Sequence, residues 1–293
     1  MKISTHRIYT KDNLELFGLL YEPESKSDAI LIHVHGMAGN FYENKFLDAI
    51  AETLTAKGIA FFVFNNRGCE YIKDLYKVES GQRMIVRIGD TFERFEDCLL
   101  DIASAVDFAK DEKYTTIHLS GHSLGAPKVA YFAAERGNDL ASVIFLSPAD
   151  MVGLALKEKN FDLEISTAQR MIKEGKGDEI MSAMVWGDSY LSANTYMSLS
   201  DKNSKVAIFN LYDSKDPLSV LGRIKSPMHT IMGREDGALV VPIEETMNRI
   251  ATAAKSSPSV QTKILGNADH GYVGDEQNLA DEILRWIRYC ASR

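Results

Sequence analysis

The segment Gly121-His122-Ser123-Leu124-Gly125 decides the fold because of the residues on either side of it. The apolar run 115–119 precedes it and is typical of a buried strand, while residues 126–135 have the composition of a helix. A G-x-S-x-G sequence between a strand and a helix predicts a sharp turn that exposes the serine hydroxyl. Glycines flank this turn because side chains there would collide with neighbouring backbone.

Strand and helix signals alternate on both sides of this turn. After a hairpin at 3–10 and 14–21, the expected strands lie at 29–34, 59–64, 115–119, 142–146, 227–232 and 260–265. The expected helices lie at 43–57, 91–109, 126–135, 242–254 and from 275 onward. In the second of these helices, acidic residues are expected to face solvent: Glu93, Glu96, Asp97 and Asp101. The alternation predicts the α/β class, with a mostly parallel sheet and right-handed crossovers.

The alternation stops after residue 150. No clear strand follows until 205–211 or 227–232, so we expect residues 1–150 and 205–293 to form the core and 151–204 to form a helical cap or lid. Five of the chain's 11 methionines fall in this insertion together with four aromatic residues: Met151, Met171, Met181, Met184, Met197, Phe161, Trp186, Tyr190 and Tyr196. They either line an adaptable apolar cavity or form the cap's own core.

Composition narrows the class of protein. The chain has 293 residues, of which 45% are hydrophobic and 25% charged, as in an ordinary globular protein. A net charge of -8 without a basic stripe argues against a nucleic-acid partner. No apolar run approaches the ~20 residues needed to cross a bilayer, and the first residues lack a signal peptide's apolar stretch. Three cysteines without metal-ligand spacing agree with a reducing compartment, so we expect a cytoplasmic location.

A serine nucleophile needs a base, normally a histidine that a carboxylate holds in place. His270 follows the last expected strand in a polar loop and is the favoured base. The acid is expected after the penultimate strand, where Glu235 and Asp236 stand side by side. We favour Asp236, with Glu235 as the alternative, because adjacent loop residues point in different directions.

Other titratable residues are expected to be structural. Four histidines lie in predicted strands, and a fifth lies inside the turn at Ser123 and cannot serve its neighbour as a base: His6, His33, His118, His229 and His122. Asp213 and Asp216 precede a proline, and two carboxylates without histidine partners indicate a capped turn more than a metal site.

The order of nucleophile, acid and histidine along the chain resembles that of the α/β-hydrolase superfamily. The resemblance covers essentially the whole chain and implies a central, mostly parallel sheet flanked by helices. It also implies an oxyanion hole where His35-Gly36-Met37 follows a strand, formed by the backbone N–H groups of Met37 and Leu124. The expected activity is hydrolysis of a small-molecule carboxylic ester through an acyl-enzyme, with no metal or organic cofactor.

Three segments resemble a finer branch, the siderophore-esterase-like hydrolases. They are residues 93–98, 121–132 and 216–219, with the sequences ERFEDC, GHSLGAPKVAYF and DPLS. These segments belong to the framework and leave the identity of the ester open. Two alternatives to an esterase remain: an amide or thioester hydrolase with the same catalytic residues, and a non-catalytic ligand-binding protein of the same fold.

Overall fold

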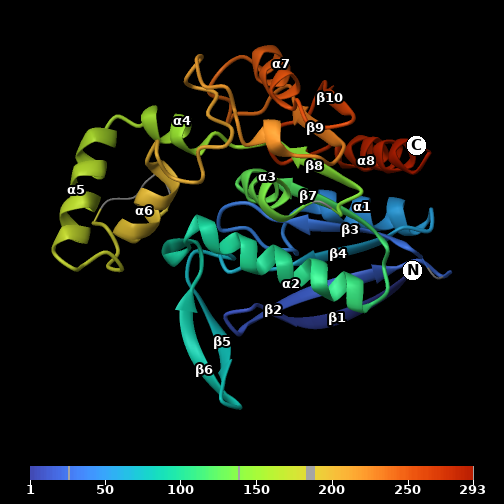
Figure 1. The fold of residues 1–293 in the computed structure, drawn as a ribbon, viewed down its shortest axis with the longest axis horizontal. Helices are drawn as coiled ribbons and strands as arrows, with labels where there is room; N and C mark the ends of the chain where they lie inside the picture. The colour runs from blue at the N-terminus through green and yellow to red at the C-terminus, as the bar shows by residue number, and fades with distance from the viewer. Residues whose placement is uncertain (26, 138, 183–188, 293) are drawn as a thin grey trace.

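The structure, a computed structural model, describes residues 1–25, 27–137, 139–182 and 189–292. Within these residues, ten strands form one sheet in the order β10-β9-β8-β7-β3-β4-β2-β5-β6, with β1 paired to β2 (Figure 1). The strands are β1 (Lys2–Tyr9), β2 (Leu14–Glu22), β3 (Ala29–Val34), β4 (Ala60–Phe64), β5 (Lys73–Glu79), β6 (Gln82–Ile88), β7 (Thr116–His122), β8 (Ser142–Leu146), β9 (Met228–Gly233) and β10 (Val260–Leu265).

The strands from β10 to β4 run parallel, and β1, β2, β5 and β6 pair antiparallel at one side of the sheet. Every residue of β4, β8 and β9 is buried, as in strands covered on both faces, and β4 is apolar throughout. The predicted α/β class with a mostly parallel sheet is therefore confirmed. The carboxyl ends of the parallel strands meet at one edge, which is where loops of such sheets bind ligands.

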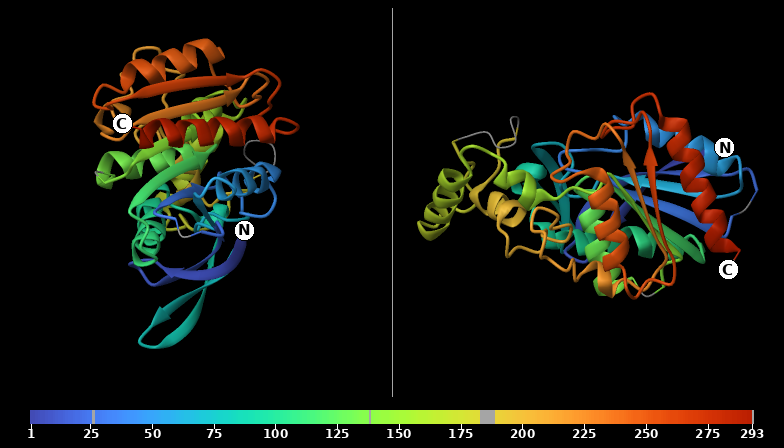
Figure 2. Two further views of the ribbon diagram at one scale, coloured as in Figure 1. Left: turned by 90° about the vertical axis from the view of Figure 1, so that its right-hand side faces the viewer. Right: turned by 90° about the horizontal axis from the view of Figure 1, so that it is seen from above.

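Helices cover both faces of the sheet (Figure 2). The helices are α1 (Lys45–Thr55), α2 (Cys98–Asp111), α3 (Gly125–Arg136), α4 (Met151–Leu156), α5 (Phe161–Lys173), α6 (Ala193–Ser200), α7 (Ile243–Ala253) and α8 (Glu276–Ala291), with short 3-10 turns at Asp90–Phe92 (η1), Phe95–Asp97 (η2) and Leu221–Arg223 (η3). Apolar side chains of α1 and α8 form one core cluster with the sheet, and those of α2, α3 and α7 belong to another. None of the helices in the described ranges has the length and apolar character to span a bilayer.

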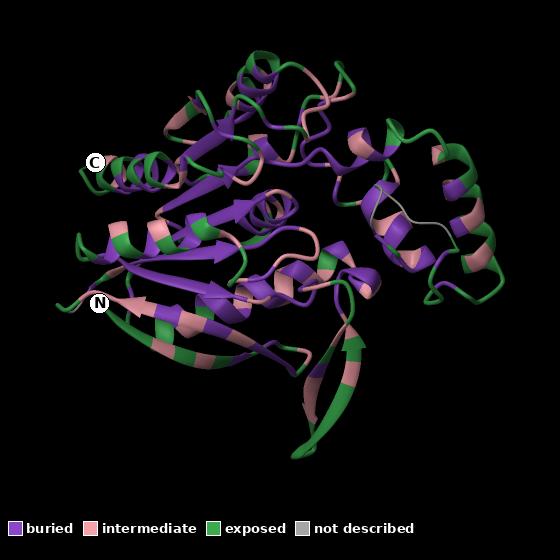
Figure 3. Ribbon diagram, turned by 180° about the vertical axis from the view of Figure 1, so that it is seen from behind, coloured by how far each residue is buried: buried purple, intermediate pink, exposed green. Residues whose placement is uncertain are grey.

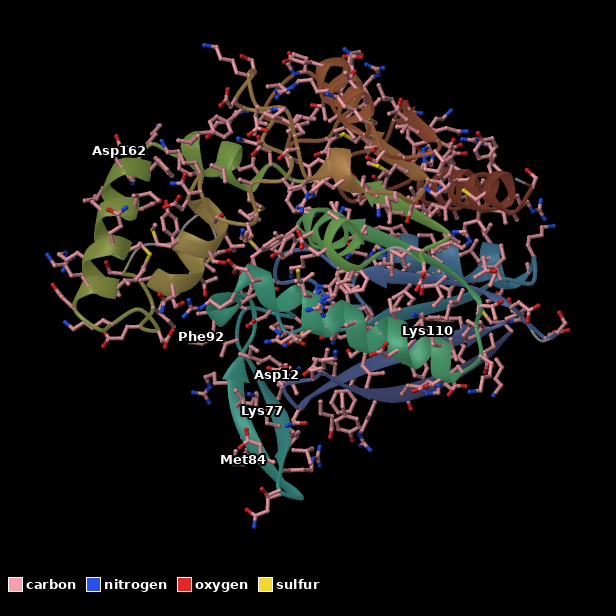
Figure 4. The ribbon with its side chains drawn as sticks, viewed as in Figure 1. Asp12, Lys77, Met84, Phe92, Lys110 and Asp162 are labelled. Atoms are coloured by element: carbon pink, nitrogen blue, oxygen red, sulfur yellow. The ribbon has the colours of Figure 1, made fainter. Side chains whose placement is uncertain are left out.

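The segment between β4 and α2 differs from the prediction. The hairpin β5–β6 was not expected. It projects from the sheet, and its residues are mostly exposed or half-buried (Figure 3). Strands that bury few side chains carry only a weak apolar pattern in the sequence. Lys77 of this hairpin lies 3.8 Å from the carboxylate of Asp12, and Figure 4 shows both side chains near its base. The helix expected at 91–109 begins only at Cys98. Glu93 is buried in extended backbone before it, so its assignment to a solvent face was wrong.

Asp101 was also wrongly placed on the solvent face of this helix. It is buried and accepts hydrogen bonds from the guanidinium of Arg67, including Nη2 at 2.9 Å. The backbone N–H of Arg67 donates to the same carboxylate at 2.8 Å. This pair fastens the turn after β4 to α2.

The section from 151 to 204 contains α4, α5 and α6, and the last two lie to one side of the sheet in Figure 1. The hydroxyl of Tyr196 donates to Glu164 at 3.0 Å and joins α6 to α5. The methionines and aromatics of this section, which were expected either to line a cavity or to form the cap's own core, mostly pack: Met151, Met181 and Tyr196 are buried, and Met171 and Met197 pack against the same cluster. Tyr190 is exposed. Met184 and Trp186 fall outside the described residues. Of the two alternatives for a following strand, 205–211 forms turns, and the chain returns to the sheet at β9.

Candidate active site

Ser123 occupies a strained turn between β7 and α3. Its φ of 53° lies in the left-handed region, which a residue with a side chain rarely adopts. A Cβ at Gly121 would lie 2.2 Å from the carbonyl oxygen of Gly125, and one at Gly125 would lie 2.1 Å from that of Val34. Only glycine fits at both positions, so these residues permit the sharp turn that the G-x-S-x-G sequence predicted.

Asp236 and His270 come together beside this turn. Asp236 follows β9, His270 follows β10, and Nδ1 of His270 donates to Oδ1 of Asp236 at 2.8 Å. The Asp236 side chain is 1% exposed and that of His270 is 31% exposed. Glu235, the alternative acid, is exposed, with its backbone N–H bonded to the carbonyl of Ala268. The structure thus brings Asp236, and not Glu235, to the histidine.

The environment keeps Asp236 ionised. Burial alone raises the pKa of a carboxyl group, but the hydrogen bond and charge of His270 and the N–H of Ala238 act in the opposite direction. The net result is a pKa of Asp236 below its ordinary value. A carboxylate held in this form fixes the orientation of the imidazole and stabilises its protonated form.

Ser123 and His270 line one pocket of about 730 Å³ together with the loop after β3. A Cβ at Gly36 would lie 2.8 Å from the Cβ of Ser123, so this loop passes directly against the serine. Met37 lines the same pocket, and Leu124 immediately precedes α3, where the first N–H groups of a helix have no acceptor within the helix. Met37 therefore shares the pocket with Ser123, and Leu124 follows Ser123 directly at the start of α3.

The remaining histidines and acids expected to be structural have structural contacts. Nε2 of His122 donates to the carbonyl of His270 at 2.7 Å, and burial together with the charge of His270 lowers the pKa of His122 to about 3. Three strand histidines bond to neighbouring elements: His33 to Ser120, His118 to Ser142 and His229 to Glu282. Asp213 and Asp216 accept backbone N–H groups two residues ahead, as in a capped turn.

Comparison with known proteins identifies the family. Residues 25–277 match the model of the family described as serine aminopeptidase, S33. The chain belongs to this S33 family. It is an α/β hydrolase, and its likeness to solved structures extends over almost all of the chain.

The proteins to which this S33-family chain is similar include a lysophospholipase and esterases by name. Probable lysophospholipase L2 of Haemophilus influenzae is 23% identical, with 97% of this chain and 91% of that protein aligned. The structure of Est1E from Butyrivibrio proteoclasticus with bound ferulic acid has a TM-score of 0.68 and 18% identity, covering 98% of this chain and 99% of that one. Esterase Pf2001 of Pyrococcus furiosus has a TM-score of 0.61 and 18% identity, covering 98% and 92%.

The pocket of this S33-family hydrolase has a mixed lining that the sequence did not reveal. Tyr42, Tyr71 and Ile72 supply aromatic and aliphatic surface, and Glu43 and Glu70 supply acidic groups. The hydroxyl of Tyr42 donates to Glu70, and Lys73 lies 3.0 Å from the same carboxylate. These hydrogen bonds hold the pKa of Glu70 below its ordinary value, so Glu70 is an anion at neutral pH. These lining residues lie in the loops after β3 and β4. Their position after the carboxyl ends of two predicted strands was the sequence feature that could have identified them.

Proposed function

We propose that this S33-family chain hydrolyses carboxylic esters with Ser123 as the nucleophile, His270 as the base and Asp236 as the carboxylate that orients the base. The observation that carries the proposal is the 2.8 Å hydrogen bond between His270 and Asp236 in the same pocket as the strained Ser123. Three loops that are far apart in the sequence supply these groups. A serine, a histidine and a buried carboxylate in this arrangement perform acyl transfer on several unrelated folds.

The reaction follows from the roles of these groups. Because Nδ1 of His270 is bonded to Asp236, Nε2 is the nitrogen that takes the proton from the Ser123 hydroxyl. The serine oxygen attacks the ester carbonyl, and the N–H groups of Met37 and Leu124 hold the oxyanion that forms. His270 then protonates the leaving alcohol, and a water molecule activated by the same nitrogen releases the acid.

The pocket lining supports a neutral ester with an aromatic or aliphatic group as the substrate class. Tyr42 and Tyr71 offer aromatic contact surface, and ferulic acid, which Est1E binds, is an aromatic acid. Glu43 and Glu70 disfavour a substrate with a negative charge near the ester. None of the similar proteins named above is a siderophore esterase, so the proposed substrate class is neutral carboxylic esters in general.

Amide hydrolysis by the same residues is the second candidate. The family description names an aminopeptidase, and Glu43 in the pocket is a carboxylate that can bind a substrate's ammonium group. Thioesters would use the same acyl-enzyme chemistry. Turnover of aminoacyl anilides faster than of neutral p-nitrophenyl esters would favour this candidate over the esterase.

The proposed chemistry is that of side chains and backbone groups of the chain, without a metal or organic cofactor. We also propose a cytoplasmic location, which the cysteines support. Cys69 and Cys98 are buried and form no disulfide, and burial raises the pKa of Cys69 to about 12. Free cysteines agree with a reducing compartment.

The test is the loss of ester turnover in Ser123→Ala and His270→Ala. Each variant should lower kcat for p-nitrophenyl butyrate by roughly 10³-fold or more, because either change removes the acyl-transfer step. Circular dichroism should show an unchanged fold. A fluorophosphonate should label the wild-type protein at Ser123 and leave the alanine variant unlabelled. Turnover retained in Ser123→Ala, or no labelling of the wild type, would refute the mechanism and favour a ligand-binding protein.

A further inference from the structure

Two side chains of opposite charge are buried beside the turn that follows β4. Lys128 of α3 and Glu93 before α2 form an ion pair, and each side chain is 0% exposed. A Cβ at Gly68 would lie 2.1 Å from Oε2 of Glu93, so the carboxylate is packed directly on the turn after β4. Removing two charges from water is costly, and apolar residues at both positions would often serve stability as well or better. Stability alone therefore gives no reason for this pair.

The ammonium of Lys128 is connected to the end of β3 through Asn66. Nζ of Lys128 donates to Oδ1 of Asn66 at 3.3 Å. Because an ammonium group can only donate, the oxygen of the Asn66 amide faces Lys128 and its nitrogen faces the other way. That nitrogen donates to the carbonyl of His35 at 3.4 Å. The backbone N–H of Gly68 also donates to Oδ1 of Asn66, at 3.0 Å. Lys128 and the Gly68 turn on which Glu93 packs therefore orient together the Asn66 amide that holds the residue just before Gly36.

The backbone of Asn66 determines the proton position on His35. Its N–H donates to Nε2 of His35 at 3.0 Å, so Nε2 carries no proton and Nδ1 does. Nδ1 in turn donates to the carbonyl of Gly36 at 2.8 Å, and the N–H of Gly39 donates to the same oxygen at 3.3 Å. Burial, together with the charge of Lys128, lowers the pKa of His35 to about 3, which keeps the ring neutral.

The carbonyl of Gly36 and the N–H of Met37 belong to one planar, trans peptide unit, in which they point in opposite directions. Fixing the carbonyl against His35 and Gly39 therefore also fixes the direction of the Met37 N–H. Stabilisation of an oxyanion depends on such a donor being in place before the reaction.

We propose that the buried Lys128–Glu93 pair is a positioning device for the oxyanion donor Met37, acting through Asn66 and His35. The inference rests on the proposed function, because it assumes that the Met37 N–H holds an oxyanion. Lys128 and Glu93 touch no substrate in this scheme. They keep the turn after β4 and the loop after β3 in one relative arrangement.

The test replaces both charges together, as Glu93→Leu/Lys128→Met. Neither partner is then left buried without its counter-charge, so the variant should fold and keep a melting temperature within a few degrees of the wild type. With p-nitrophenyl butyrate, kcat should fall about 10- to 100-fold while KM stays within about threefold, because the lost interaction acts in the transition state. The inhibition constant of an alkyl trifluoromethyl ketone, whose adduct carries an oxyanion, should rise in parallel with the fall in kcat/KM.

Glu282→Gln is the control, since it alters another buried contact of a carboxylate, the one between Glu282 of α8 and His229 of β9. It should lower the melting temperature and leave kcat and the inhibition constant unchanged. Wild-type kcat and inhibition in the double variant would overturn the positioning role, whereas activity of Ser123→Ala would overturn the proposed function itself. If the double variant does not fold, Asn66→Ala interrupts the same connection at its next step. Retention of wild-type kcat in that variant would equally overturn the inference.

Discussion

Two histidine–carboxylate pairs of almost equal length occupy different regions of this protein. His270 and Asp236 lie 2.8 Å apart at the carboxyl edge of the sheet, and His229 and Glu282 lie 2.7 Å apart between β9 and α8. The His270 side chain is 31% exposed, and that of His229 is 0% exposed. The same chemical pair therefore occurs once beside the pocket and once in a closed part of the fold.

The difference between the pairs lies in the second ring nitrogen. Nδ1 of His229 bonds to the carbonyl of Gln261 at 3.0 Å, so both of its nitrogens face oxygen atoms of the protein. His270 uses Nδ1 for Asp236 and lines the pocket with Ser123. A short histidine–carboxylate contact is thus no mark of catalysis by itself. Access for a substrate and a nucleophile beside the other nitrogen distinguish the two regions.

The largest expected difference in activity is between two neighbouring carboxylates, Asp236 and Glu235, when each is converted to its amide. Asp236→Asn should lower kcat for p-nitrophenyl butyrate by roughly 10³- to 10⁴-fold, because an amide stabilises neither the required tautomer nor the protonated imidazole. Steady-state kinetics on folded protein measures this loss. Glu235→Gln removes the neighbouring exposed carboxylate and should keep kcat within about twofold. If Glu235→Gln loses activity and Asp236→Asn remains active, Glu235 and not Asp236 is the carboxylate that orients His270.

The framework of the site could be predicted from the sequence because local signals carry it. Apolar runs marked β3, β4, β8 and β10 closely, and the order of nucleophile, acid and histidine selected candidates that the fold brings to one edge. The choice between Glu235 and Asp236 could not be made in this way. It depends on backbone directions in a loop, where the Glu235 side chain is exposed and that of Asp236 is buried.

The buried charges could not be predicted, since a sequence does not show which polar residues meet. Glu93 was assigned to a solvent face by helical spacing, but the helix begins later and Glu93 packs on Gly68. Lys128 is the exception, because it is a lysine among the buried apolar residues of α3. A charge in such a segment indicates a partner elsewhere in the chain.

A smaller difference is expected between anionic and neutral esters, because the pocket that His270 lines also contains Glu43 and Glu70. The anionic ester mono-p-nitrophenyl succinate should have a kcat/KM about tenfold below that of p-nitrophenyl butyrate, because Glu43 and Glu70 repel its carboxylate. Glu43→Gln should reduce this preference to about threefold, and added salt should act in the same direction. Glu235→Gln makes the same change in net charge away from the pocket and should leave the preference intact. An unchanged preference in Glu43→Gln would remove Glu43 from the specificity of the pocket.

The smallest effect on turnover is expected at the closed pair. Glu282→Gln should leave kcat within about twofold, because neither His229 nor Glu282 reaches the pocket, yet it should lower the free energy of unfolding. Burial raises the pKa of Glu282, but hydrogen bonds from Arg285 and His229 outweigh burial and lower the pKa to about 2. Such a shift corresponds to about 3 kcal/mol, and screening by solvent around the pair reduces the expected loss to ~2 kcal/mol.

The pH dependence of that loss separates an ionic contribution from a packing one. The pKa of Glu282 is lower in the folded state, so its carboxylate stabilises the fold fully above pH about 4.5 and progressively less as the pH falls toward 2. Urea unfolding of wild type and Glu282→Gln should therefore give a difference in unfolding free energy that is constant near neutral pH and closes between these two values. A difference that persists unchanged at pH 2 would mean that Glu282 contributes through shape alone. The closed pair would then differ from the His270 pair in kind, and not only in its access to substrate.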